Sequence, residues 1–129
     1  MRRLAAKHSP FEAACYVDSV SLTAEGNGAG AGDLSLGLID ANGNAVEAVC
    51  SLFCWFSSDA DGADVHSTTP SAIAASTGSL LAGANNKSFT AITDANGDFA
   101  MSYSQAADSY IHVQLPNGRI VSTELLNLA

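Results

Sequence analysis

The sequence predicts an all-β protein in which antiparallel strands pack as a β-sandwich. Its most informative feature is an Asn-Gly pair that recurs in three short segments, residues 40–44, 94–98 and 115–119. Asn and Gly adopt the backbone angles of tight turns between antiparallel strands at little cost. Apolar segments with alternating side chains flank these turns. With 129 residues, the chain suits one domain with a single core.

Seven segments have the composition expected of strands. The third is almost continuously apolar and contains Trp55 between two phenylalanines, which favours a central strand that is covered on both faces. Seven strands at this spacing are typical of an immunoglobulin-like (Ig-like) sandwich. The segments are residues 15–24, 34–39, 46–56, 88–93, 99–104, 109–115 and 119–125.

The second Asn-Gly turn predicts the register of one hairpin. A two-residue type I′ loop at residues 96–97 pairs the strand before it with the strand after it, so that Ile92 faces Met101. The larger side chains of this hairpin then share one buried face. The opposite face would carry Ala91, Thr93, Ala100, Ser102 and Ser104.

Residues 57–88 interrupt the strand pattern. They are rich in Ser, Ala, Asp, Thr and Gly, and their large apolar side chains are few, namely Ile73, Leu80 and Leu81. Loops longer than about fifteen residues without structure of their own are uncommon in compact domains. We therefore expect short strands or a brief helix in this segment, and a contact with a partner through the three apolar side chains.

Basic residues are concentrated at the N-terminus. Arg2, Arg3 and Lys7 supply three of the five Lys and Arg residues, although the formal net charge is −8. The acidic remainder of the chain repels nucleic acid, while a short basic segment can bind an acidic protein surface. We expect residues 1–12 to form an extended basic arm, with Phe11 as an apolar contact, and residues 13–129 to form the sandwich domain.

We expect a core with few large side chains. We also expect a chain that does not act at a membrane. The hydrophobic fraction is 47%, but it includes 23 alanines, each of which buries little area. Small domains with lean cores often depend on neighbouring subunits. No apolar segment reaches the length of about eighteen residues that crosses a bilayer, and no apolar stretch of a signal peptide follows the first residues.

No pattern of catalytic residues is recognisable, so we expect neither an enzyme nor a cofactor. The sequence has no Gly-x-Ser-x-Gly motif and no carboxylate pair in an apolar setting. The histidines are His8, His66 and His112. His112 is expected to point away from its apolar neighbours on a strand, and each histidine is interpreted as solvated or hydrogen-bonded.

One acidic segment leaves a calcium site open as an alternative. Asp59, Asp61 and Asp64 are two and three residues apart and are interrupted by a glycine, and calcium binds such oxygen-rich loops. Acidic side chains in turns also commonly accept hydrogen bonds from their own backbone. We favour this second interpretation, here and for the turn residues Asp40, Asp94 and Asp98.

The three cysteines match neither a zinc site nor a redox motif. Cys50 and Cys54 lie on one expected strand, about 13 Å apart, too far for a disulfide between them. Buried free thiols are favoured. A bond from Cys15 to either of them remains open.

Several segments in order resemble the Ig-like domains of virion structural proteins from tailed bacteriophages. Thr-Asp-Ala-Asn-Gly-Asp-Phe at 93–99 is followed by Ala-Asp-Ser-Tyr-Ile-His-Val at 107–113 and by Leu-Pro-Asn-Gly-Arg at 115–119. The similarity extends over residues 34–129. Each short motif has low specificity, whereas their order and spacing are more specific. The resemblance implies a protein that is not an enzyme and that decorates the surface of a phage head or tail.

The single domain with a basic arm favours a capsid decoration (cement) subunit over a fibre. Such a subunit binds the lattice of the major capsid protein on the exterior of the head, and a homo-oligomer is expected. An outward-facing or tail-associated adhesin is the alternative, in which Trp55, Tyr103 or Tyr110 would stack on carbohydrate, although burial in the core explains Trp55 better. The expected partner-binding residues are Arg2, Arg3, Lys7, Phe11, Ile73, Leu80 and Leu81.

Overall fold

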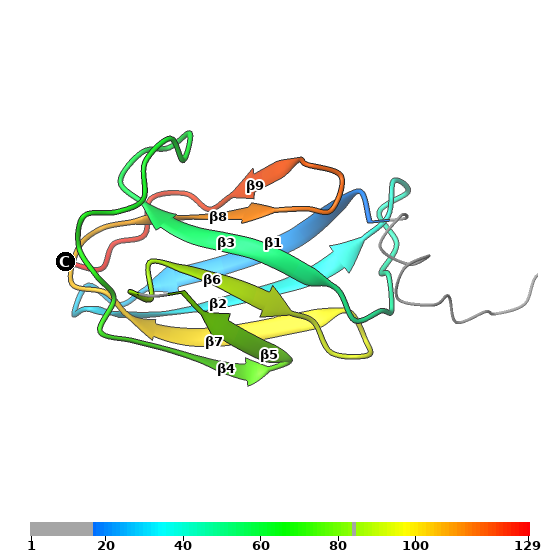
Figure 1. Cartoon of the computed structure of the whole chain (residues 1–129), viewed down its shortest axis with the longest axis horizontal. Coiled ribbons are helices and arrows are strands. Elements are labelled where there is room, and N and C mark those ends of the chain that lie inside the picture. Colours follow the sequence, from blue (N-terminus) through cyan, green and yellow to red (C-terminus); the bar gives the residue numbers. More distant parts are fainter. Residues whose placement is uncertain (1–16, 84) are drawn as a thin grey trace, which may run out of the picture.

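The computed structural model describes residues 17–83 and 85–129, which form nine strands and no helix. The strands make two antiparallel sheets that face each other (Figure 1). The predicted all-β sandwich is thereby confirmed. The strands are β1 (Ser19–Gly26), β2 (Ala31–Ile39), β3 (Ser51–Ser57), β4 (Ala72–Thr77), β5 (Ser79–Ala82), β6 (Ser88–Ile92), β7 (Asp98–Ser104), β8 (Tyr110–Gln114) and β9 (Ile120–Ser122).

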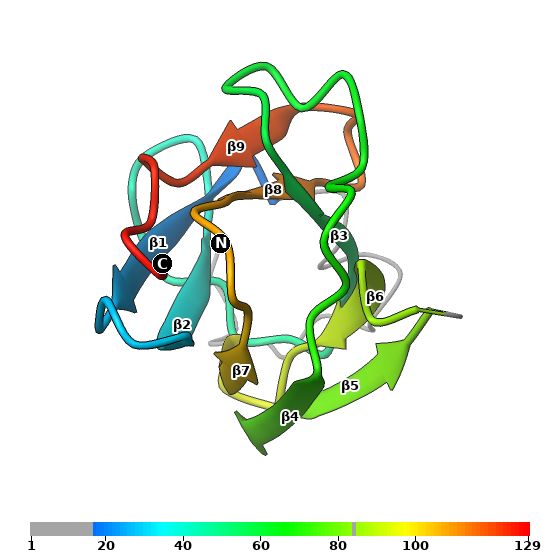
Figure 2. The same cartoon turned by 90° about the vertical axis from the view of Figure 1, so that its left-hand side faces the viewer.

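The four-stranded sheet has the order β1-β2-β7-β4 and the five-stranded sheet the order β5-β6-β3-β8-β9. Seven strands keep the pairing order of a seven-stranded Ig sandwich, with β1, β2, β7 and β4 in one sheet and β3, β8 and β9 in the other. β5 and β6 are an added hairpin that extends the second sheet beside β3. Seen end-on, the sheets form a nearly closed ring in which β4 lies next to β5 and β1 next to β9 (Figure 2).

The structure has two strands more than the seven predicted. β4 and β5 lie within residues 57–88, where short strands were one of the two expectations. Gly78 alone joins them, and its backbone has φ of +75°, an angle that glycine tolerates. A side chain at this position would also meet the carbonyl oxygen of Ile92 at 2.3 Å. The chain therefore changes sheets within one residue.

The inward side chains of both sheets make one apolar core. Phe56 of β3 is fully buried, and its ring lies 5.4 Å from the ring of Tyr103 and 6.0 Å from that of Phe89. β3 is the central strand of its sheet, as predicted. The expectation that both of its faces are covered is wrong, because Phe53 on the outer face is 48% exposed.

The three Asn-Gly turns share a geometry that differs from the predicted type I′ loop. Only the glycine of each pair has positive φ: +82° at Gly43, +79° at Gly97 and +87° at Gly118. The Gly43 N–H donates to the carbonyl of Asp40 at 3.0 Å, and the Asp40 N–H donates to the carbonyl of Asn44 at 2.9 Å. The loop therefore has three residues, with glycine in the left-handed position.

The predicted hairpin between β6 and β7 does not form, because the turn at residues 94–98 passes from one sheet to the other. Bonds to both sheets hold this segment: Leu38 N–H of β2 donates to Gly97 O in the turn, and Thr93 N–H, just before the turn, donates to Cys50 O beside β3, both at 3.0 Å. The predicted buried face is right for β7. It is wrong for β6, which buries Phe89 and Ala91.

Candidate docking face on the five-stranded sheet

The outer face of the five-stranded sheet lacks Asp, Glu, Lys and Arg on its strands, although the chain is strongly acidic. The cores of protein interfaces are likewise depleted of charge and enriched in aromatic residues. We call this surface the docking face. It consists of Ser79 and Leu81 of β5, Ser88, Thr90 and Ile92 of β6, Ser51, Phe53 and Trp55 of β3, Tyr110, His112 and Gln114 of β8, and Ile120 and Ser122 of β9.

One row of side chains crosses all five strands of the docking face. The strand register places Leu81, Thr90, Phe53, Gln114 and Ile120 side by side in that order. The exposed fractions of the large apolar members are 61% for Leu81, 48% for Phe53 and 46% for Ile120. Phe53 lies on the central strand, with the other two each two strands away. The row is therefore symmetric about β3.

Aromatic rings form a strip along β3 and β8. The ring of Phe53 stacks on that of Trp55 at 5.6 Å, and the ring of Trp55 lies 5.3 Å from that of His112. The Trp55 Nε1–H donates to the carbonyl of Gly62 at 3.2 Å, which fixes the indole. Trp55 is thus half-buried on the outer face. Its expected burial in the core is wrong.

The loop after β3 folds over one end of the docking face. His112 is fully buried beneath it, with Nε2 3.0 Å from the carbonyl of Asp59 and Nδ1 2.5 Å from the Ser122 hydroxyl. A carbonyl only accepts, so Nε2 carries a proton, and in the neutral ring Nδ1 then accepts from the Ser122 hydroxyl. His66 is bonded in the same way, with Nε2 donating to Asp108 O and Nδ1 accepting from a backbone N–H. Both histidines therefore have hydrogen-bond partners at both nitrogens.

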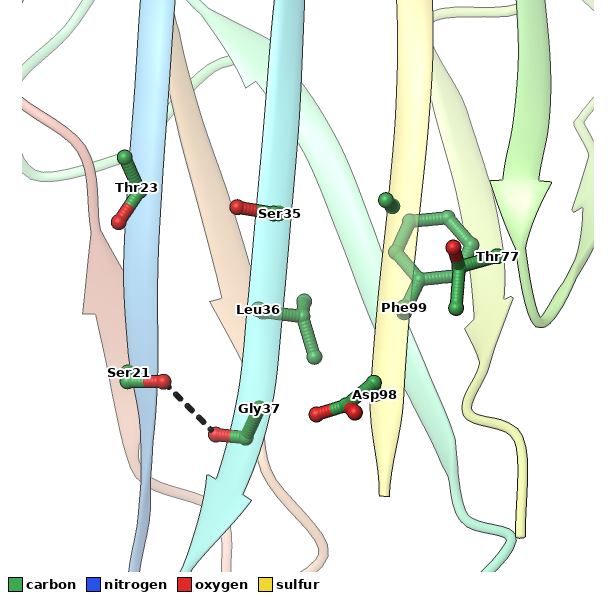
Figure 3. A pocket seen from close by; sticks show the side chains of 9 residues that line it. Ser21, Thr23, Ser35, Leu36, Gly37, Thr77, Asp98 and Phe99 are labelled. Atoms are coloured by element: carbon green, nitrogen blue, oxygen red, sulfur yellow. Dashed lines mark hydrogen bonds between the residues drawn. The ribbon is translucent and has the colours of Figure 1, made fainter. Parts of the chain in front are cut away.

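The outer face of the four-stranded sheet has a different chemistry. Its centre is an open depression of about 340 Å³, where Ser21, Ser35 and Asp98 surround Gly37 (Figure 3). The Ser21 hydroxyl donates to the Gly37 carbonyl at 3.4 Å. The face is built from small hydroxyl side chains, alanine and carboxylates. Its acidic residues are Glu25, Asp33 and Asp98.

The predicted partner-binding residues lie in three different places. Leu81 is on the docking face. Ile73 and Leu80 are half-buried and pack against the core, so only part of each side chain is available for the predicted contact. Arg2, Arg3, Lys7 and Phe11 lie outside the described residues, as does Cys15.

Sequence reasoning missed Phe53 and Ile120. An unbroken apolar run has the same sequence whether its second face meets another part of the fold or stays exposed, so Phe53 was assigned to the interior. Ile120 follows a turn on a strand of only three residues, which gives too few alternations to assign a face. The strand register supplies the missing signal.

Three of the six acidic side chains, Asp40, Asp61 and Asp94, accept hydrogen bonds from their own turns as favoured, whereas among the described residues Asp59, Asp64 and Asp98 accept none. Asp61 Oδ1 accepts the Ala63 N–H at 3.1 Å, and the carboxylates of Asp40 and Asp94 each accept two N–H groups of their own turns. Within residues 17–83 and 85–129, no three His, Cys, Asp or Glu side chains are grouped so that they could hold a metal ion. Asp59, Asp61 and Asp64 therefore form no such group.

The two described cysteines have free, buried thiols. Burial raises the pKa of Cys54 to about 12 and also raises the pKa of Cys50. A thiol with a raised pKa is a weak nucleophile at neutral pH. Both side chains act as small apolar groups of the core.

Comparison with protein-family models, curated protein sequences and solved structures gave no match. In the described part of the chain, no helix is long and apolar enough to span a membrane. The contrast between the two outer faces is thus the main structural indication of function.

Proposed function

We propose that this chain is a structural subunit of a phage virion, which decorates the head by binding the lattice of the major capsid protein. The observation that carries the proposal is the docking face, an uncharged, aromatic surface on an acidic sandwich. Exposed apolar rows of this kind are a hazard for a free monomer and are normally covered in an assembly. The segment similarity to phage virion domains points in the same direction.

The role would be passive reinforcement. The basic residues Arg2, Arg3 and Lys7 supply attraction to an acidic lattice surface, and this attraction weakens with salt. Weak contacts of many subunits add through multivalency. Bridging neighbouring capsid proteins in this way would hold the shell against internal pressure.

Deleting residues 1–12 should lower affinity for purified undecorated heads at least about tenfold, because three charge-assisted contacts are lost. The fold should keep its far-ultraviolet circular dichroism, since the described core begins at Val17. Co-sedimentation with heads measures the binding. Lys87→Gln, which removes a positive charge outside the arm, is the control and should bind normally. Unchanged binding by the deletion variant would contradict the role of the arm.

A carbohydrate-binding adhesin is the second candidate, favoured by the exposed aromatic strip. Phe53 and Trp55 present stacked rings at the surface, and aromatic rings are common platforms for sugars. Tyr103 cannot serve, because only 2% of it is exposed. A glycan array separates the candidates: a hit that disappears in Phe53→Ala supports the adhesin, and a blank array removes it.

A further inference from the structure

We propose that Asn42 is a site of spontaneous covalent modification, where the side-chain amide is lost and aspartate or isoaspartate forms. In unfolded chains this reaction is fastest at asparagines that precede glycine. The fold should restrict it at three of the chain's Asn-Gly pairs and permit it at Asn42. The inference goes beyond the proposed function and does not depend on it. The Asn-Gly pairs are residues 27–28, 42–43, 96–97 and 117–118.

The reaction needs only the chain and solvent water. The backbone nitrogen of Gly43 attacks Cγ of Asn42, and the new N–Cγ bond closes a succinimide ring. The Cγ–Nδ2 bond breaks, the Gly43 nitrogen gives up its proton, and Nδ2 leaves as ammonia. Water then opens the ring at either carbonyl, which gives aspartate or isoaspartate. Glycine favours ring closure because it has no side chain to obstruct the approach.

Ring closure makes two demands on the structure. The Asn side chain must be free to turn towards the next backbone nitrogen, and the peptide bond after Asn must rotate out of its turn geometry. All four Asn residues are exposed, so access to water does not distinguish them. The hydrogen bonds and the packing around each pair do. The four are Asn27, Asn42, Asn96 and Asn117.

Asn27 is held by hydrogen bonds that ring closure would break. Its Oδ1 accepts the N–H groups of Ala29 at 2.8 Å and Ala31 at 3.1 Å. The attacking nitrogen would be that of Gly28, whose N–H donates to the carbonyl of Asn127 at 2.9 Å. Both the side chain and the nucleophile are therefore fixed.

The side chain of Asn117 is also held at both ends. Its Oδ1 accepts the Arg119 N–H at 2.9 Å, and Nδ2, the leaving group, donates to the carbonyl of Asp18 at 3.4 Å. The Gly118 N–H donates to the carbonyl of Leu115 at 2.9 Å. Turning the side chain would break the contact between this turn and the residue before β1.

Asn96 lies in the same type of turn as Asn42, and neither side-chain amide has a hydrogen-bond partner among the described residues. At Asn96 it is the following glycine that is restrained. Gly97 is buried, and its carbonyl accepts the Leu38 N–H at 3.0 Å. A Cβ at Gly97 would overlap the carbonyl oxygen of Val46, so the backbone there is closely packed. Rotation of this peptide bond would push against a neighbouring segment.

Gly43, in contrast, is exposed, and a Cβ built on it would have nothing within 4 Å. Rotation of the Asn42–Gly43 peptide bond breaks the turn's own bond from the Gly43 N–H to the Asp40 carbonyl, at 3.0 Å, and displaces no packed segment. The product should be tolerated for the same reason. Modified chains should therefore accumulate as folded protein with one more negative charge.

Ageing of the purified full chain tests the site. The chain is incubated at mildly alkaline pH, where the backbone nitrogen loses its proton more readily, and a protease digest is analysed by tandem mass spectrometry. Conversion at Asn42 should be at least about tenfold faster than at Asn27, Asn96 or Asn117, a difference of about 1.4 kcal/mol in activation free energy. In urea, where the chain is unfolded, the four rates should converge. Equal rates in the folded chain, or faster conversion at any of the other three, overturn the proposal.

Asn42→Gln and Asn96→Gln are a matched pair of variants. Glutamine would have to close a larger ring, so it loses its amide far more slowly. In isoelectric focusing of aged protein, the main acidic species should be absent from Asn42→Gln and present in Asn96→Gln. Asn42→Asp has the charge of the product on a normal main chain, so it marks the position of that species, and it should keep the urea midpoint of the wild type. Loss of the acidic species from Asn96→Gln instead would overturn the assignment to Asn42.

Discussion

Replacing Gly97 with alanine should lower the free energy of unfolding by about 3 kcal/mol or more, whereas the same change at Gly43 should cost only about 1 kcal/mol. Both glycines occupy the same position of the same turn type, with φ of +79° and +82°. Backbone strain is therefore nearly equal. The surroundings differ: a Cβ at Gly97 would lie 2.0 Å from the carbonyl oxygen of Val46, and a Cβ at Gly43 would have nothing within 4 Å.

The overlap at Gly97 involves backbone, so it cannot be relieved by a change of rotamer. The turn is bonded to Leu38 on one side, and the chain just before it is bonded to Cys50 beside the other sheet, so any shift disturbs both sheets. Urea denaturation of the two variants and the wild type measures the difference. Gly118→Ala, at φ of +87° in open space, is a second control. Equal losses at all three positions would mean that strain alone matters and that Val46 has room to move.

The turns also show how far local sequence determines structure here. The Asn-Gly pairs locate all three turns correctly, because glycine is needed wherever φ is positive. They do not determine the loop length, since both a two-residue and a three-residue loop accept Asn-Gly. Nor do they determine whether the next strand stays in the same sheet. At residues 94–98 that choice depends on bonds to Leu38 and Cys50, which are distant in sequence.

Strands of small residues were the hardest to predict. β4 has the sequence Ala-Ile-Ala-Ala-Ser-Thr, in which Ile73 is the single large side chain and the other inward and outward side chains are similarly small. Periodicity gives no signal for such a strand, although β4 pairs with β7 along its length. The strands with large alternating side chains, β2 and β7, were assigned correctly. A strand can therefore be predicted from sequence where the side chains on its two faces differ in size or polarity.

The docking face could not be predicted from local sequence, for a related reason. Its row joins side chains from five strands, and four separate pairings decide which residues become neighbours. Leu81 was identified as a candidate because it stands out in a polar segment. Phe53 was not, because its neighbours on β3 are also apolar. The absence of charge is a property of the assembled face and becomes visible only when the register is known.

Two phenylalanines on β3 provide the second large effect. Phe56→Ala should lower the free energy of unfolding by about 3–5 kcal/mol, as expected for a buried aromatic side chain that leaves a cavity. Phe56 is 0% exposed and touches the rings of Phe89 and Tyr103 across the core. Phe53→Ala, three residues earlier on the outer face, should cost about 1 kcal/mol or less. Urea denaturation of both variants, with the slope of the transition checked against the wild type, measures the two losses.

This pair also separates folding from association. Phe53→Ala should keep the chain folded while it removes the aromatic side chain at the centre of the docking face, because Phe53 lies at the surface and not in the core. Phe56→Ala should weaken association only to the extent that it unfolds the chain. If Phe53→Ala proved as destabilising as Phe56→Ala, its ring would be part of the fold itself. The docking face would then lose the residue at its centre, and attachment to the virion would need another explanation.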